Sequence, residues 1–138
     1  TWVTRKNGHV DRIASAWLIR RFIDARPTFK FVAGQGYRAK DQEVTFDMFE
    51  ATFTHVGDRC TFEVLLARVG LDDAALHRIA EIVHDIDLRD ARFDAPETAG
   101  VERLITGLAS RQRDDELRLA RGGELFDDLY ESFRSKRK

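Results

Sequence analysis

The stretch VDRIASAWLIRRFID, residues 10–24, predicts a helix that lies inside the protein. At about 100° per residue, its large apolar side chains point in nearly every direction around the helix axis. A helix that is apolar all round is buried, so its polar side chains need partners. The helix is expected to end before Pro27, because residues that precede a proline avoid the α conformation. The apolar residues concerned are Ile13, Trp17, Leu18, Ile19, Phe22 and Ile23.

The polar residues of this helix form a candidate anion site. Asp11, Arg12 and Ser15 lie within about 100° of one another, near the start of the helix. Unpaired backbone N–H groups and the helix dipole favour an anion there. Arg20 and Arg21 lie one to two turns further on and extend the site, so we expect Arg12, Ser15, Arg20 and Arg21 to bind an oxyanion. The alternative is that Asp11 caps the helix and that Arg12 and Arg20 pair with carboxylates elsewhere.

The segments on either side of this helix predict an α+β fold that is mainly α-helical, with a small N-terminal β-sheet. Short apolar or alternating stretches predict strands at residues 2–4, 29–33 and 44–47, separated by a glycine-containing loop at 34–42, and residues 48–53 are ambiguous. Helices are predicted over residues 61–69, from Asp72 or Asp73 to 88, from Pro96 to 110, from Asp114 to a break at Gly122–Gly123, and over 124–134. The basic residues 135–138 predict a solvated end.

Composition limits the class of protein. A length of 138 residues indicates one domain, at roughly 100–200 residues per domain. The formal net charge of −1 argues against a domain that binds nucleic acid by bulk electrostatics. A lone cysteine, Cys60, excludes an internal disulfide and a cysteine-rich zinc site. Because no apolar run approaches a membrane span, we expect no membrane contact and a cytoplasmic location. The first residue is Thr1, and we expect further sequence upstream.

The predicted helix 73–88 presents candidate metal ligands. His77 falls on its polar side and is expected to be solvated, whereas His84 borders the apolar arc. Asp87 projects into that arc, which is costly unless something binds both side chains. Helical metal centres present Glu and His ligands at this same spacing of three residues. Asp85 points nearer to solvent, but a helix end at this point would turn it inward.

A second group of candidate ligands lies in HVGDRCTFE, residues 55–63. We predict a mixed nitrogen and oxygen site of His55, Glu63 and His84, with Asp85 or Asp87 supplying a further oxygen. Such ligands suit a divalent Zn, Mn or Fe ion. The alternative is that the histidines are satisfied core residues and that Glu63 complements the dipole of its helix. Cys60 is expected to be a small buried or capping residue, because it has no resolving partner.

The order of these residues along the chain resembles that of a known enzyme superfamily. His55 followed 29 residues later by His84–Asp85 is similar to the pattern of the HD metal-dependent phosphohydrolases. The final aspartate of that pattern would be Asp114, Asp115, Asp127 or Asp128. The residues around His55 predict a loop, whereas that superfamily has a helix there.

Four segments together resemble the chromate-resistance family of ChrB C-terminal domains. They are WVTR at 2–5, HVDRIASAWLIRRFID at 9–24, the stretch 55–63, and VHDIDL at 83–88, and the likeness runs from residue 2 to about 130. The resemblance implies a bacterial sensing domain encoded beside a chromate efflux pump. In two-domain members a DNA-binding region precedes it, so DNA would be contacted only through that region. Shorter relatives carry a cysteine-containing opening near Gly8–His9, and its absence here favours the regulator type.

The resemblance implies that the domain senses chromate or a similar oxyanion and shifts between two states. In this interpretation Arg12, Arg20 and Arg21 form an anion pole, and His55, Glu63 and His84 form a metal pole of the same pocket. The alternative is a metal-dependent enzyme with redox or hydrolytic activity on a small substrate. A third possibility is an interaction module that joins two copies in a homodimer. Its surface would be the apolar stripe of the last helix, which is more typical of core: Leu125, Phe126, Leu129, Tyr130 and Phe133.

Overall fold

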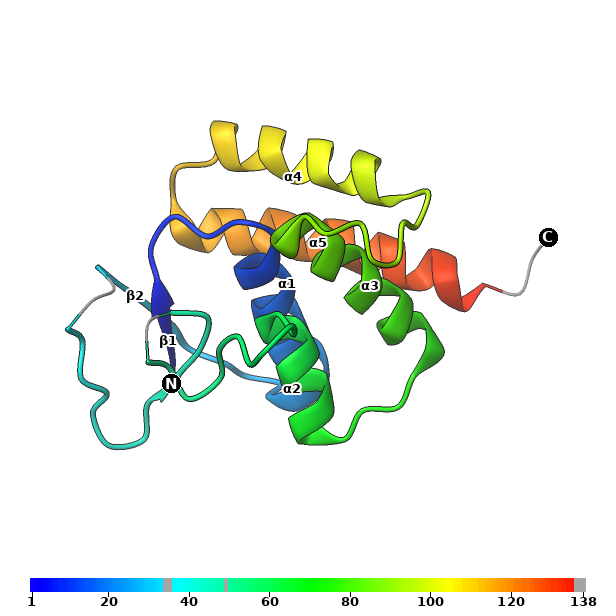
Figure 1. Cartoon of the computed structure of the whole chain (residues 1–138). Helices are drawn as coiled ribbons and strands as arrows, with labels where there is room; N and C mark the ends of the chain where they lie inside the picture. The colour runs from blue at the N-terminus through cyan, green and yellow to red at the C-terminus, as the bar shows by residue number, and fades with distance from the viewer. Residues whose placement is uncertain (34–35, 49, 136–138) are drawn as a thin grey trace.

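Five α-helices and a small sheet make up the computed structural model, which describes residues 1–33, 36–48 and 50–135. This confirms the predicted α+β class, mainly helical with an N-terminal sheet. The sheet and the helices occupy opposite sides of the molecule, and α4 lies along α5 (Figure 1). In chain order the elements are β1 (Trp2–Arg5), α1 (Val10–Leu18), η1 (Ile19–Ile23), β2 (Phe29–Val32), β3 (Val44–Thr45), α2 (Thr61–Val69), α3 (Ala74–Leu88), α4 (Thr98–Arg111) and α5 (Asp115–Arg134).

The sheet has three parallel strands in the order β2-β1-β3. Trp2 at the start of β1 lies opposite Phe29 of β2 and Val44 of β3. Parallel strands need a long crossover, and α1 with η1 supplies the one between β1 and β2. Since β2 and β3 flank β1 on different sides, the connections that leave β1 and β2 run toward opposite edges of the sheet. In open parallel sheets ligands bind beyond the carboxyl ends of the strands at such a point.

Helix α1 is buried, as its all-round apolar sequence predicts. It packs against α2, α3 and α5, and all of its side chains except that of Arg12 are buried. Trp17 is the centre of an aromatic cluster, with ring centroids 5.7–6.4 Å from its neighbours. The rings around it come from three elements, η1, α2 and α5, and belong to Phe22, Phe62, Phe126 and Tyr130.

The predicted helix 10–24 is not uniform. Its last turn is the π-helix η1, in which the backbone N–H of Asp24 donates to the carbonyl of Ile19 at 2.7 Å. Asp24 is already extended, three residues before Pro27. π-Turns are uncommon and the hydrophobic periodicity does not reveal them.

The predicted break at Gly122–Gly123 is wrong, because α5 continues through both glycines. A Cβ on Gly122 would collide with the side chain of Ile13 in α1. Glycine weakens a helix by about 1 kcal/mol relative to alanine. Here the close approach of α1 to α5 requires glycine, and the packing of the two helices offsets the cost.

The predicted helix starts at Asp72 or Asp73 and at Asp114 are confirmed, and Asp73 is the capping residue of the first. Asp73 accepts hydrogen bonds from the backbone of Ala75 and Leu76, and Asp114 accepts one from Leu117. Helix α4 begins at Thr98, two residues later than Pro96. Part of the predicted loop 34–42 and most of the basic tail lie outside the described residues. No helix within the described ranges combines the length and the apolar character needed to cross a bilayer.

Candidate metal centre

Asp11 is the most buried acidic side chain of the centre, with 3% of its surface exposed. Its carboxylate accepts hydrogen bonds from the backbone N–H groups of Thr61 and Phe62, both at 2.9 Å. These are the first N–H groups of α2, so Asp11 caps a helix other than its own. One interpretation of the sequence has Asp11 as a cap of its own helix. The hydrogen bonds of Asp11 instead join the start of α1 to the start of α2.

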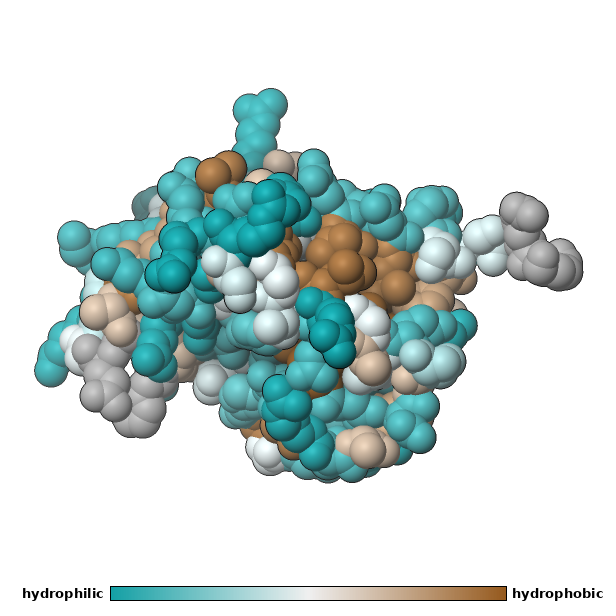
Figure 2. Space-filling view, turned by 90° about the horizontal axis from the view of Figure 1, so that it is seen from above, coloured by the Kyte–Doolittle hydropathy of each residue, from teal (hydrophilic) through white to brown (hydrophobic). Residues whose placement is uncertain are grey.

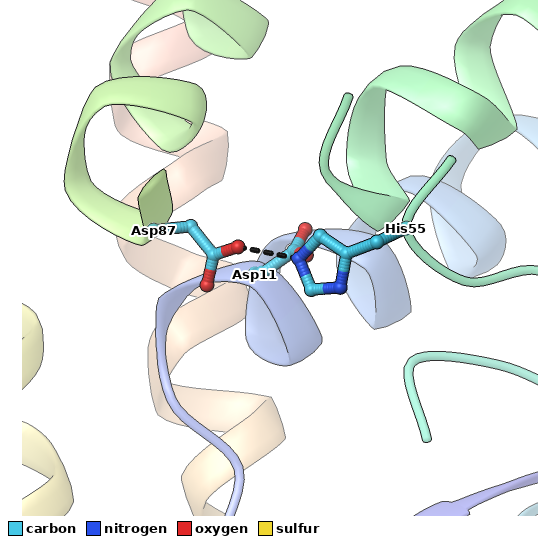
Figure 3. Close-up of side chains that lie close together, drawn as sticks. All are labelled: Asp11, His55 and Asp87. Carbon is cyan, nitrogen blue, oxygen red and sulfur yellow. Dashed lines mark hydrogen bonds and ion pairs between the residues drawn. The ribbon is translucent and has the colours of Figure 1, made fainter. Parts of the chain in front are cut away.

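His55 and Asp87 meet beside Asp11. Nε2 of His55 lies 2.7 Å from Oδ2 of Asp87 and 3.6 Å from Oδ2 of Asp11. One ligand atom from each of the three residues lies within 4.8 Å of the other two. They come from the start of α1, the loop before α2 and the end of α3, and their side chains point toward one another (Figure 3). His55 remains 45% exposed, which leaves the cluster open on one side.

Several carboxyl groups gather around this imidazole. Burial, together with the charges of Asp47 and Asp87, raises the pKa of Asp11 to about 8, although two backbone N–H groups favour its charged form. Partial burial lowers the pKa of His55, but the hydrogen bond to Asp87 and the charge of Asp11 outweigh it and raise that pKa overall. A divalent cation would offset this excess of carboxylates.

His84 occupies a different cluster. Its ring is fully buried, with Nδ1 2.7 Å from Oε1 of Glu63 and Nε2 2.9 Å from Oδ2 of Asp90. Burial lowers the pKa of His84, but the hydrogen bonds to the two carboxylates raise it overall. Glu63 also accepts from the backbone N–H of Cys60, the residue that precedes the first turn of α2. The expectation of a buried, capping Cys60 is therefore confirmed.

Asp85 is buried and holds the loop that follows α3. Its carboxylate accepts from the backbone N–H groups of Phe93 at 3.0 Å and Asp94 at 2.7 Å. A ligand atom of Asp85 also lies within 4.8 Å of ligand atoms of His84 and Asp90. The end of α3 does turn Asp85 inward, and two backbone N–H groups already satisfy it there.

The five predicted metal ligands therefore divide between two places. His55 and Asp87 lie with Asp11, whereas the other three lie apart from them. Among the described residues, no group of three neighbouring ligand atoms contains both His55 and His84. A charged residue on an all-apolar helix was the signal for Asp11, but nothing in the sequence pointed to Asp90. The remaining predicted ligands are His84 itself and two carboxylates that lie beside its ring, Glu63 and Asp85.

The four predicted anion ligands do not converge either. Arg12 donates to the backbone carbonyl of Asp47 at 2.7 Å and pairs with its carboxylate at 3.2 Å. The hydroxyl of Ser15 is buried and has no hydrogen-bond partner among the described residues. Arg20 stacks over the ring of Phe29, and Arg21 pairs with Asp127 at 2.6 Å. The alternative interpretation, in which Arg12 pairs with a carboxylate, describes its contacts.

Nor does the chain assemble an HD-type centre from the described residues. Asp114 caps α5, and Asp115 accepts from the backbone N–H of Asn7. Asp127 accepts from Trp17 and Arg21. None of the four candidate aspartates, Asp128 included, belongs to either cluster of neighbouring ligand atoms in the described part of the chain.

Comparison with known proteins gives a match over nearly the whole chain. The family model described as ChrB, C-terminal domain, matches residues 2–133. Protein ChrB of Cupriavidus metallidurans is 42% identical over 138 residues, which cover 99% of this chain. The chain spans only 42% of the length of that relative. No solved structure gives a significant match.

Proposed function

The chain belongs to the family of ChrB C-terminal domains, and on this premise we propose that it is the ligand-binding domain of a chromate-resistance regulator, with a divalent metal ion at Asp11, His55 and Asp87. The observation that carries the metal site is the convergence of these three side chains from separate segments. Their ligand atoms lie within 4.8 Å of one another. One imidazole and two carboxylates suit Zn, Mn or Fe(II).

The position of this cluster supports a binding role. It lies where the chain leaves β1 for α1, beside Asp47, which follows β3. This is the carboxyl end of the parallel sheet, where its connections diverge. The exposed edge of His55 leaves room for a further ligand, as open metal sites do.

We propose that an oxyanion such as chromate binds through the metal. The carboxylates of Asp47 and Asp87 lie close enough to Asp11 to raise its pKa, and their charge repels a free dianion. A bound cation supplies the opposite charge and an open coordination position. Occupancy would then bias the relative positions of α1, α2 and α3, because the cluster joins all three. This is the two-state shift that a sensor needs.

The DNA contact of such a regulator would lie outside this domain. The net charge of −1 gives the chain no basic field with which to hold DNA. We propose that a separate DNA-binding region reads the operator in the cytoplasm and that this domain reports on its ligand.

Metal analysis and calorimetry test the proposal. The untreated protein is analysed for Zn, Mn and Fe, and each ion is titrated into the metal-free protein. We expect one ion per chain and a loss of affinity of about 10-fold or more in His55→Gln and Asp87→Asn. Asp11→Asn is less suitable, because Asp11 also caps α2.

The matched control is His77→Gln, which removes an exposed imidazole that lies 3.3 Å from Asp72. Its metal affinity should equal that of the wild-type chain. Wild-type affinity in both His55→Gln and Asp87→Asn would overturn the metal site. Chromate and sulfate titrated with and without metal then test the oxyanion, and equal binding in metal-free protein would contradict binding through the ion.

A further inference from the structure

One face of the α4–α5 hairpin carries an apolar groove. Leu104 on this face is 58% exposed, more than any other large apolar side chain that the structure describes. An apolar patch is visible from above, the direction in which α4 faces the viewer (Figure 2). We call this groove and its charged rim the α4–α5 face. The groove is lined by Val101, Leu104, Ile105, Leu125, Phe126 and Leu129.

The outer row of α4 includes two glycines at positions where the described residues leave room for a larger side chain. Gly100, Leu104, Gly107 and Arg111 recur at the spacing of one helix side. A Cβ on either glycine would meet nothing within 4 Å. Glycine weakens a helix relative to alanine, so these residues cost stability without serving packing in the described chain. They leave room for a second backbone to approach beside Leu104.

The rim of the face carries charged side chains of both signs. Arg103 and Arg111 lie on α4, and Glu124 and Asp128 lie on α5, with Arg121 at the end of the acidic row. None of the hydrogen bonds or ion pairs between the described residues involves these five side chains. A partner whose surface carried charges of one sign only would be repelled by one of the two rows. A second copy of the same face can be turned by 180° about an axis parallel to α4 and α5. Its acidic α5 then lies opposite the basic α4 of the first copy, and the reverse contact is the same.

We propose that the α4–α5 face is a homodimer interface. Two copies pack about a twofold axis that runs along the hairpin, and Leu104 of each copy enters the groove of the other. Arg103 of one copy then faces Asp128 of the partner subunit, twice per dimer. Helix α4 is only about 21 Å long at 1.5 Å per residue, so the interface is small and we expect a Kd in the micromolar range. The proposal shares no residue with the metal centre.

Sedimentation velocity of the 138-residue chain, from about 1 to about 500 µM, measures the dimer. Leu104→Glu should raise the Kd at least about tenfold, because it buries a charge in an apolar groove. The control is Leu117→Glu, at a side chain that is 53% exposed but lines a different cavity. Gly107→Ala should raise the melting temperature of the monomer and weaken the dimer by about fivefold.

A mixing experiment tests the charge pairing itself. Arg103→Asp and Asp128→Arg should each weaken the homodimer, since each places like charges opposite one another. Mixed together, the two variants should form a heterodimer of nearly wild-type affinity, because both contacts are then complementary. Only pairing between copies predicts this recovery.

Three results would overturn the proposal. They are a chain that stays monomeric at all concentrations, a dimer that Leu104→Glu leaves unchanged, and single charge variants whose mixture does not recover. Circular dichroism checks that each variant folds. If Leu104→Glu does not fold, Gly107→Ala and the mixing experiment decide the question.

Discussion

Nδ1 of the buried His84 lies 2.7 Å from Oε1 of Glu63, and this contact links the end of α3 to the first turn of α2. The other ring nitrogen faces Asp90, from the loop that follows α3. Both nitrogens of a neutral imidazole cannot donate at once, whereas both nitrogens of an imidazolium do. The pair of carboxylates therefore favours the charged ring, although burial opposes it.

The first prediction concerns pH. Since the folded chain raises the pKa of His84, the charged ring contributes stability that is fully present below the ordinary pKa of 6.5. That contribution is lost as the pH rises through the raised value. Urea unfolding from acidic to alkaline pH should show this decline, and Glu63→Gln should reduce it, because one of the two partners loses its charge. An unchanged pH profile in Glu63→Gln would contradict the charged assignment.

The second prediction concerns the two glycines of α5. Gly122→Ala should lower the free energy of unfolding by about 1–3 kcal/mol, because the new methyl group collides with Ile13. Gly123→Ala is the matched control, since its Cβ would lie 3.8 Å from Cδ1 of Trp17, an ordinary contact. It should be neutral or stabilise the helix by up to about 1 kcal/mol. Equal effects in urea unfolding would rule out the close approach as the cause.

The third prediction concerns Arg118, a buried arginine that no carboxylate among the described residues pairs. Its guanidinium donates to the carbonyls of Gln112 at 3.0 Å, Gly8 at 2.8 Å and Ala109 at 2.7 Å. It therefore ties the loop after β1 to the turn between α4 and α5. Arg118→Met should cost about 2–4 kcal/mol in urea unfolding, since three carbonyls lose their donor.

Arg113→Met serves as the control for that substitution, because Arg113 is exposed beside the same turn. It should change the free energy of unfolding by no more than about 0.5 kcal/mol. A similar loss in both variants would show that the carbonyl contacts of Arg118 do not stabilise the turn.

Local sequence patterns determined the fold class and most element positions. The all-round apolar stretch that opens at Val10 specified a buried helix, and Asp73 and Asp114 specified helix starts, because capping and periodicity act over a few residues. For the site, the sequence predicted only the types of residue, namely an imidazole with nearby carboxylates. Two members of the final cluster, His55 and Asp87, were among the predicted ligands.

Tertiary structure decided which of those residues meet. Spacing along the chain does not tell that Asp11 caps α2, or that His55 approaches Asp87 while His84 is enclosed by Glu63 and Asp90. The same holds for the continuous α5, where a glycine that breaks helices by propensity is required by a side chain far away in sequence. In each case the deciding contact joins segments that only the folded core brings together, and local propensity carries no information about such a contact.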